Sequence, residues 1–369
     1  MSDAKTSWGL FPQRRTHLLP FLFTFWPPSA PPAAAMTMIL WRIVYDVLLG
    51  LFSWLMEVLD RPIQSVFGDN LTYLRTPCWL PREEGTVVVT GGDSGFGREV
   101  VHQMASLGYR VIFTAQEEEK GRQTLQAIRD ETGNPNLEVS TVDFASLKSV
   151  RAFAQGLKER GVAIHVLVNA AGGMFTERVL TSDGLEAAFQ VNYLSHFLLT
   201  TSLVDNLSKA SPPARVINTS SLFHWLGGVR LDDLQHKRWY LPPLAYADSR
   251  LASILFTREL QRKFTESGNT GIRVVAAHPG PVDAVLPRFS DVYTRMLSSL
   301  SIKKIPWTSR THLYACLAPQ EKLSPGAYYA ETRRMPVSFA AKDPELGAKF
   351  WAESEKILRQ ADGRYKSAF

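Results

Sequence analysis

Cysteine is scarce in this chain, and its scarcity limits the class of protein. Only Cys78 and Cys316 occur among the 369 residues, and they lie far apart. Two such cysteines build neither a disulfide framework nor a cysteine-rich metal site, so both are expected to be free thiols. No cluster of histidine, cysteine and carboxylate residues suggests a ligand set either, and we expect no metal.

Long runs of like charge are also absent. The chain has 41 Lys and Arg against 35 Asp and Glu, a formal net charge of +6, and its basic residues are scattered. Because no basic run is interleaved with aromatic residues, nucleic acid is not an expected partner. The composition, 45% hydrophobic and 21% charged, is that of a globular protein. The length suffices for one core of roughly 250–300 residues and an appendage.

The first segment, residues 1–35, differs from the rest of the chain. Three basic residues against one acid precede the apolar run Leu18–Trp26, and a Pro/Ala-rich stretch follows it. A basic start, a short apolar run and small residues are typical of a cleavable signal peptide. An unstructured or untranslated leader before a start at Met36 or Met38 is the alternative, and both remain open.

Residues 36–60 are strongly apolar and are interpreted as a membrane anchor helix, followed by a linker over residues 61–83. The apolar length is close to the roughly 20 residues that a bilayer requires. Arg42 and Asp46 interrupt it, but they are four residues apart and share one helix face. Three aromatic residues suit the membrane interface, namely Trp41, Tyr45 and Trp54. The anchor either spans the bilayer or lies in its interface; a helix packed on the rest of the protein is the alternative.

From residue 84 onward, short apolar runs alternate with helical stretches. This rhythm predicts parallel crossovers, and therefore an α/β domain over residues 84–369 with a Rossmann-type doubly wound parallel sheet. Its ligand crevice is expected at the carboxyl ends of the strands. Strands are predicted at Thr86–Val89, Tyr109–Thr114, Val139–Val142, Ile164–Val168, Arg215–Thr219 and Ile272–Ala277, and helices at 95–107, 118–132, 146–160, Leu185–Leu207 and Ala245–Phe264. The region after residue 277 is expected to be less regular.

A glycine-rich turn joins the first strand to the first helix. It reads Thr90-Gly91-Gly92-Asp93-Ser94-Gly95-Phe96-Gly97. Glycines let the backbone turn sharply and approach a pyrophosphate, and the positive end of the helix dipole stabilises its charge. In this position, between the first strand and helix of an α/β chain, the turn predicts a dinucleotide site.

Further motifs give the chain a specific resemblance to the short-chain dehydrogenase/reductase family over about residues 84–290. The turn is similar to the family's Thr-Gly-x-x-x-Gly-x-Gly fingerprint. Stretches such as Leu231–Gln235 and Leu251–Glu259 resemble the retinol-dehydrogenase-like group. The resemblance implies the following site residues: Gly91, Ser94, Gly95, Phe96, Gly97, Gln116, Asp143, Asn169, Ala170, Gly172, Pro279 and Gly280 for the cofactor, and Asn192, Ser221, Tyr246 and Arg250 for catalysis, with Tyr246 and Arg250 also at the cofactor.

The implied reaction is hydride transfer between nicotinamide and a carbinol carbon, with Tyr246 as acid/base and Ser221 orienting the substrate oxygen. Asn192 would hold a proton-relaying water. Phenols are weak acids, and a nearby cation stabilises the phenolate. The family places a lysine four residues after the tyrosine; this chain has Arg250, which keeps the charge but not the compact ammonium geometry. After the Pro-Gly turn, Ala284 replaces a frequent threonine.

Two readings of the function follow from these departures. In the first, the chain is an active oxidoreductase. In the second, it is a pseudoenzyme or binding protein that keeps the fold and turns over poorly. Ala115 and Gln116 at the end of the second strand are neither the acid that favours NAD nor the base that favours NADP. Lys120 and Arg122 follow on the next helix, so the sequence slightly favours NADP over NAD.

The segment between Ser221 and Tyr246 is expected to pass over the crevice, because both of its ends are site residues. Its aromatic and aliphatic side chains suit a lipophilic substrate, such as a retinoid, steroid or polyprenoid, or else pack the segment onto the sheet. With the anchor, the resemblance predicts a membrane protein of the endoplasmic reticulum; a secreted or mitochondrial protein is the alternative, and a homodimer is left open. Asn70 is the only plausible glycan site among three Asn-x-Ser/Thr sequences.

Overall fold

The computed structural model describes residues 79–82, 85–280 and 308–369. The leader, the anchor and most of the linker lie outside these ranges, as do Cys78, Asn70 and Ala284, so the predictions made for them stay predictions. Within the described ranges, no helix combines the length and the apolar character that a membrane crossing needs.

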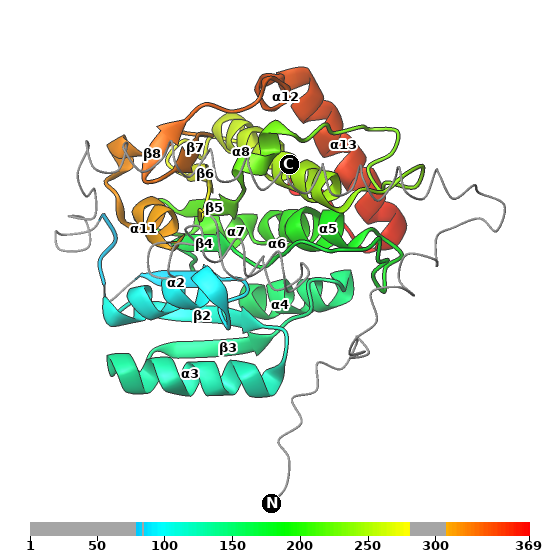
Figure 1. The fold of residues 1–369 in the computed structure, drawn as a ribbon. Helices are drawn as coiled ribbons and strands as arrows, with labels where there is room; N and C mark the ends of the chain where they lie inside the picture. Colours follow the sequence, from blue (N-terminus) through cyan, green and yellow to red (C-terminus); the bar gives the residue numbers. More distant parts are fainter. Residues whose placement is uncertain (1–78, 83–84, 281–307) are drawn as a thin grey trace, which may run out of the picture. The chain divides into compact units, whose positions relative to one another are not determined.

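A single eight-stranded sheet organises the described residues (Figure 1). Its strand order is β3-β2-β1-β4-β5-β6-β7-β8, and every neighbouring pair is parallel except β7 and β8. The order reverses between β1 and β4, which creates the switch point of a doubly wound sheet. The strands are β1 (Thr86–Val89), β2 (Arg110–Ala115), β3 (Leu137–Thr141), β4 (Val166–Asn169), β5 (Arg215–Thr219), β6 (Arg273–Ala277), β7 (Tyr328–Ala330) and β8 (Arg333–Met335).

Helices cover both faces of the sheet, which explains why its central strands are apolar on both sides. Successive residues of β1 point to opposite faces, and Val87 and Val89 pack in one core while Val88 packs in the other. The first core lies under α2 (Gly95–Ser106), α3 (Glu118–Thr132) and α11 (Arg310–Leu317). The second lies under α4 (Leu147–Glu159), α6 (Ser195–Ser202), α8 (Pro242–Glu266) and α13 (Pro344–Ala361).

The single helix predicted over Leu185–Leu207 is wrong in detail. The chain forms a short α5 (Ala187–Phe189), the π-helical turn η3 (Gln190–Leu194), α6 and then α7 (Val204–Ser208). The buried Glu186 side chain starts the run by accepting hydrogen bonds from the Ala188 and Phe189 amides. A π turn often marks a functional site, and this one contains Asn192.

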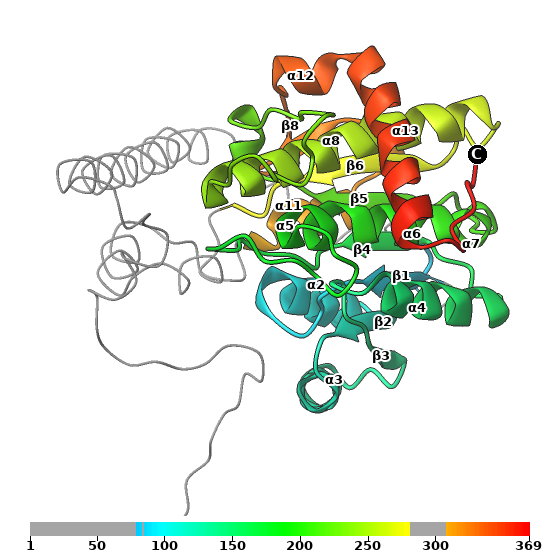
Figure 2. The same ribbon diagram turned by 90° about the vertical axis from the view of Figure 1, so that its right-hand side faces the viewer.

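The prediction of a less regular C-terminal region is also wrong. Strands β7 and β8 extend the sheet, and α12 (Phe339–Lys342) precedes the 18-residue helix α13. Figure 2 shows α13 crossing α8. Its buried residues recur at helical spacing, namely Gly347, Phe350, Trp351, Ser354 and Leu358. The amphipathic stripe was therefore present in the sequence and was not recognised.

Aromatic packing anchors α13 to the core, and this makes a testable claim about stability. The Phe350 ring stacks on Tyr193 with centroids 4.9 Å apart, and Phe350 is 1% exposed. Replacing Phe350 by alanine should lower the free energy of unfolding by about 3–5 kcal/mol, because it leaves a cavity among large aromatic side chains. Urea unfolding measures the change. Phe339→Ala is the control, since Phe339 is 84% exposed and its loss should cost less than about 0.5 kcal/mol.

Candidate active site

The glycine-rich turn is held against the loop that follows β4. The Thr90 hydroxyl oxygen accepts hydrogen bonds from the Ala170 and Ala171 amides at 2.7 and 2.9 Å. Gly91 has φ +64, and a Cβ there would lie 2.9 Å from the Ala171 Cα. Only glycine suits that conformation and that approach. The two loops predicted to bind the cofactor therefore lie side by side at the carboxyl edge of the sheet.

Helix α2 presents unoccupied amides toward this edge. Its N-cap residue is Ser94, whose side chain makes no capping hydrogen bond, and no acidic residue occupies the first turn. Gly97 lies so close to the turn that a Cβ would come 2.3 Å from the Gly91 carbonyl oxygen. Free amides at a helix N-terminus bind anions such as a pyrophosphate. The close backbone approach of Gly97 to Gly91 leaves no side chain in the way. These residues thus fit a dinucleotide.

A methyl group at Gly97 tests this fit. Gly97→Ala should weaken dinucleotide binding about tenfold, because overpacking typically costs 1–3 kcal/mol and about 1.4 kcal/mol corresponds to tenfold. Titration of NADPH fluorescence against the variant measures the dissociation constant. Gly156→Ala serves as a control in α4, where the backbone is helical and a Cβ meets nothing within 4 Å. Equal affinities for Gly97→Ala and the parent would refute the placement.

The end of β2, where a ribose or its phosphate is expected, carries mixed charge. Ala115 is buried and Gln116 is exposed. Lys120 Nζ lies 2.8 Å from Asp93 Oδ2 in the glycine-rich turn, whereas Arg122 pairs with two acids of its own helix, Glu118 and Glu119. Of the two basic residues considered for a phosphate, Lys120 is therefore the one directed toward the turn.

Two other expected cofactor residues are held by hydrogen bonds within the protein. The Asp143 carboxylate, just beyond β3, accepts a hydrogen bond from the Ala145 amide at 2.9 Å. Asn169 at the end of β4 donates to Thr200 Oγ1 and to Asn218 Oδ1 at 2.9 and 2.7 Å. Both residues thus shape the carboxyl edge of the sheet, where ligands bind in folds of this kind.

Tyr246 and Arg250 lie one turn apart on α8. The Arg250 guanidinium carbon is 4.8 Å from the centroid of the Tyr246 ring, and Arg250 Nη1 donates to the Thr219 carbonyl at the end of β5. Both side chains are buried, at 8% and 5% exposure. A cation over the face of an aromatic ring is attracted to it electrostatically. The arrangement therefore holds a phenol and a fixed positive charge together at the end of β5.

Ser221 follows β5 and begins the short helix η4 (Leu222–Trp225). It is 5% exposed, and its hydroxyl accepts a bond from the Phe223 amide. The Phe223 ring meets Tyr246 edge-on with centroids 5.8 Å apart. Two neighbouring serines, Ser220 and Ser249, instead donate to backbone, namely to the carbonyls of Arg250 and Tyr246.

The Asn192 side chain makes three hydrogen bonds within the protein. Its amide oxygen accepts from the Gly173 amide, and its Nδ2 donates to the Gly173 carbonyl and to Ser249 Oγ. A Cβ on Gly172 would lie 2.5 Å from Asn192 Oδ1 and 3.1 Å from Arg250 Nη2. Gly172 thus permits the loop after β4 to touch both expected catalytic residues. The remaining expected pair, Pro279 and Gly280, follows β6, and Gly280 has φ +87.

A small polar pocket lies behind this group. Its polar lining comes from β4, β5, the π turn and α6, and includes Asn169, Asn192, His196, Asn218 and Thr219. Burial lowers the pKa of His196 to about 3, more than a backbone hydrogen bond with Asn192 raises it, so this imidazole is neutral at physiological pH. Buried polar groups around such a space favour ordered water.

His312 was missed by the sequence analysis. It is fully buried on α11, its Nε2 lies 3.0 Å from Thr219 Oγ1, and its ring is 4.7 Å from that of Phe96 in the glycine-rich turn. Burial, and secondarily the charge of Arg250, lowers its pKa to about 3. No spacing along the chain links residue 312 to residue 96, so only the three-dimensional structure reveals it. Three further histidines, His165, His196 and His224, are also buried.

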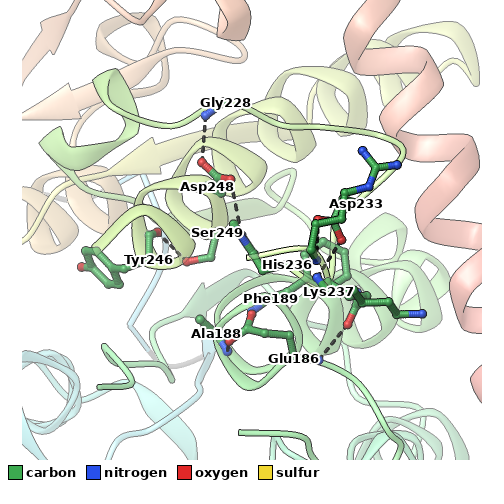
Figure 3. Close-up of polar contacts among 12 residues, drawn as sticks. Glu186, Ala188, Phe189, Gly228, Asp233, His236, Lys237, Tyr246, Asp248 and Ser249 are labelled. Atoms are coloured by element: carbon green, nitrogen blue, oxygen red, sulfur yellow. Dashed lines mark hydrogen bonds and ion pairs between the residues drawn. The ribbon is translucent and has the colours of Figure 1, made fainter. Parts of the chain in front are cut away.

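A second polar cluster lies on the other side of α8 from the Tyr246 ring (Figure 3). It includes His236, Asp248 and Glu186. Burial raises the pKa of the Asp248 carboxyl to about 6 and raises that of Glu186. These residues were not among the expected site residues.

Comparison with known proteins gives a consistent result. A model of the short chain dehydrogenase family matches residues 85–290. Human retinol dehydrogenase 12 is 35% identical over 318 residues, which cover 86% of this chain and 98% of the relative. Human polyprenol dehydrogenase is 35% identical over 75% of this chain and 86% of its own length. Among solved structures, an uncharacterised protein of Mycobacterium paratuberculosis aligns with a TM-score of 0.59 at 32% identity, covering 77% and 98% of the two chains.

Proposed function

The chain belongs to the short-chain dehydrogenase family and is a nicotinamide-dependent oxidoreductase, and from this premise we propose that it interconverts a lipophilic alcohol and the corresponding ketone or aldehyde. The observation that carries the proposal is the buried pair of Tyr246 and Arg250, which lies beside Gly172 in the loop that Thr90 holds against the glycine-rich turn. The bound dinucleotide supplies or accepts the hydride.

In this proposal the protein positions the substrate and moves one proton. Ser221 Oγ holds the substrate oxygen, and the Tyr246 hydroxyl donates a proton to that oxygen in reduction or accepts it in oxidation. Arg250 stabilises the phenolate that forms, because its guanidinium lies over the ring. Asn192 lines the small polar pocket and would hold the water that returns the proton to solvent.

The substrate class follows from the relatives and from the segment after Ser221. Two relatives are named for retinol and polyprenol, both lipophilic alcohols. The segment exposes large apolar side chains, with Trp225 at 42%, Leu226 at 42% and Trp239 at 46% exposure. Exposed apolar surface of this kind suits a lipid-soluble substrate. We therefore favour a retinoid, steroid or polyprenoid alcohol over a small water-soluble carbonyl.

NADP remains slightly favoured over NAD as the cofactor. Lys120 beside Asp93 places a positive charge at the turn, where a 2′-phosphate would need one. The Asp93 carboxylate opposes this charge, which makes the preference modest. Kinetics with both dinucleotides test it, and a large preference for NAD would reverse the assignment.

A catalytically weak binding protein is the second candidate. Arg250 in place of the family lysine supports it, because the planar guanidinium reaches both the Thr219 carbonyl and the surroundings of Gly172. A group of this width leaves less room than an ammonium beside the nicotinamide ribose.

For either candidate function, we propose that residues 36–60 attach the protein to the membrane of the endoplasmic reticulum.

The deciding experiment uses purified full-length protein in detergent or vesicles. Retinol, steroid alcohols and polyprenols are offered with NADP or NAD, and the carbonyl products are quantified. Turnover of at least one lipophilic alcohol supports the proposal. Dinucleotide binding without turnover of any of them favours the binding protein, and reaction only with small water-soluble carbonyls contradicts the substrate class.

A further inference from the structure

Asp248 lies two residues beyond Tyr246 on α8 and contacts two separate points of one loop. Its Oδ1 accepts a hydrogen bond from the Gly228 amide at 2.8 Å. Its Oδ2 lies 3.4 Å from His236 Nε2. Figure 3 shows both contacts on the side of α8 that faces away from the Tyr246 ring. One carboxylate thus joins the beginning and the end of the loop to the helix that carries the tyrosine.

The loop backbone approaches α8 closely where the first contact is made. A Cβ on Gly227 would lie 2.7 Å from the Ala247 carbonyl oxygen and 3.0 Å from the Leu251 Cβ. Glycine is therefore required for the loop to come this near. Its neighbour Gly228 meets no such obstruction, so the approach is confined to the point beside Asp248.

His236 is held in place at a cost to its backbone. It is 4% exposed and has φ +48, a backbone conformation that residues other than glycine rarely adopt. The Asp233 carboxylate supports it by accepting hydrogen bonds from the Lys237 and Arg238 amides. Strained backbone persists where surrounding contacts require it, and such positions gather at functional sites.

A second set of contacts fixes the loop beside His236. The Gln235 side-chain oxygen accepts a bond from the Glu186 amide at 2.7 Å, and Arg178 donates to the Gln235 carbonyl. Four residues after Gln235, Trp239 has the Arg230 guanidinium carbon 5.0 Å from its ring centroid. The fastened loop therefore presents its aromatic side chains in a defined position.

From these contacts we infer that Asp248 and His236 are positioning residues, which fasten the loop of residues 227–241 onto α8 and so fix the wall of the substrate crevice. The inference rests on the proposed function, because the wall matters only if a substrate binds beside Tyr246. Neither residue touches the reacting atoms. Their expected effect is on the KM for the lipophilic substrate and not on proton transfer.

The raised pKa of Asp248 indicates that its carboxylate does not serve to stabilise the fold. The pair lines a small pocket under the loop, and burial raises the pKa of Asp248 to about 6. A folded-state value above that of the unfolded chain means that folding favours the protonated acid. Stability is thus lost as pH rises through about 6, and the ionised carboxylate destabilises the fold at pH 8. The charged and titratable groups around the pair are Arg178, Glu186, Arg230, Asp233 and Tyr240.

The test compares Asp248→Ala with Asp248→Asn. Alanine removes both contacts, so the KM for the lipophilic alcohol should rise about tenfold, while kcat and the KM for the dinucleotide change less than about twofold. Asparagine keeps an oxygen for Gly228 and an amide for His236, so its KM should stay within about threefold of the parent. Asp248→Asn should also be more thermally stable than the parent at pH 8, and this gain should be smaller at pH 5. His236→Asn, which tolerates positive φ, should match Asp248→Ala, and the double variant should be no worse than either.

A readout without catalysis makes the inference independent of the proposed reaction. Lys237 and Arg238 are exposed, so limited trypsin digestion at pH 8 reports how firmly the loop is held. Cleavage after these residues should be at least fivefold faster in Asp248→Ala and unchanged in Glu266→Ala, which removes an exposed carboxylate elsewhere on α8. Unchanged cleavage and unchanged KM in folded Asp248→Ala overturn the inference. Faster cleavage in a protein that oxidises no alcohol would instead show that the loop is fastened and that the proposed function fails.

Discussion

Replacing Tyr246 by phenylalanine is expected to lower kcat about a thousandfold. General acid–base catalysis contributes roughly 10²–10⁴ to the rate, and this substitution removes only the hydroxyl that would carry the proton. The ring keeps its contacts with Phe223 and Arg250, because both are made by the aromatic face and edge. Steady-state oxidation of the best alcohol from the substrate panel measures the loss.

The matched control is Tyr109→Phe. The Tyr109 hydroxyl donates to the Leu80 carbonyl at 3.0 Å, and the residue immediately precedes β2 at the edge of the sheet opposite the site. Its loss should leave kcat unchanged. Dinucleotide affinity of Tyr246→Phe should also stay within about threefold of the parent. A Tyr246→Phe protein that retains more than a tenth of the parent kcat would show that another group transfers the proton.

Much of the fold could be predicted because its signals are local. Three consecutive buried residues, Val87, Val88 and Val89, are typical of a strand covered on both faces. The glycines that follow them are spaced as a tight turn before a helix requires, and this spacing is visible in the sequence. Six strands of the parallel part and the switch point follow from repeating this pattern, and all six are confirmed.

The errors lie where the pattern is interrupted or was not counted. A helical period continues unbroken through Gln190–Leu194 in the sequence, and the π turn there is set by packing in three dimensions and by the Glu186 cap before it. Helix α13 is different, since Asp343 as cap, Pro344 at the first position and a buried stripe were all readable. The prediction of irregular structure gave these signals too little weight.

The contacts around the site could be predicted only in part. Tyr246 and Arg250 are one helical turn apart, so their proximity follows from the sequence. His312 with Phe96, and His236 with Asp248, meet through the tertiary structure. An aspartate such as Asp248 on an amphipathic helix reads as a solvated side chain, and neither its burial nor the positive φ of His236 leaves a mark in the sequence.

Arg250 separates an active enzyme from a binding protein most sharply. Arg250→Met keeps much of the buried volume but removes the cation 4.8 Å from the Tyr246 ring. If the charge stabilises the phenolate, kcat for oxidation should fall about a hundredfold, equivalent to about 2.7 kcal/mol of transition-state stabilisation.

Arg250→Lys is the decisive companion to this variant, because lysine restores the family's compact ammonium at the same position. For an active enzyme adapted to arginine, its turnover should lie within about tenfold of the parent and its pH profile should be preserved. A rise of two orders of magnitude or more would mean that the guanidinium obstructs the reaction, and the chain would then be a binding protein that keeps the fold. Isothermal titration with each dinucleotide is the control for both variants. If Arg250→Met binds no dinucleotide, its low kcat reports a collapsed site and not the loss of the charge.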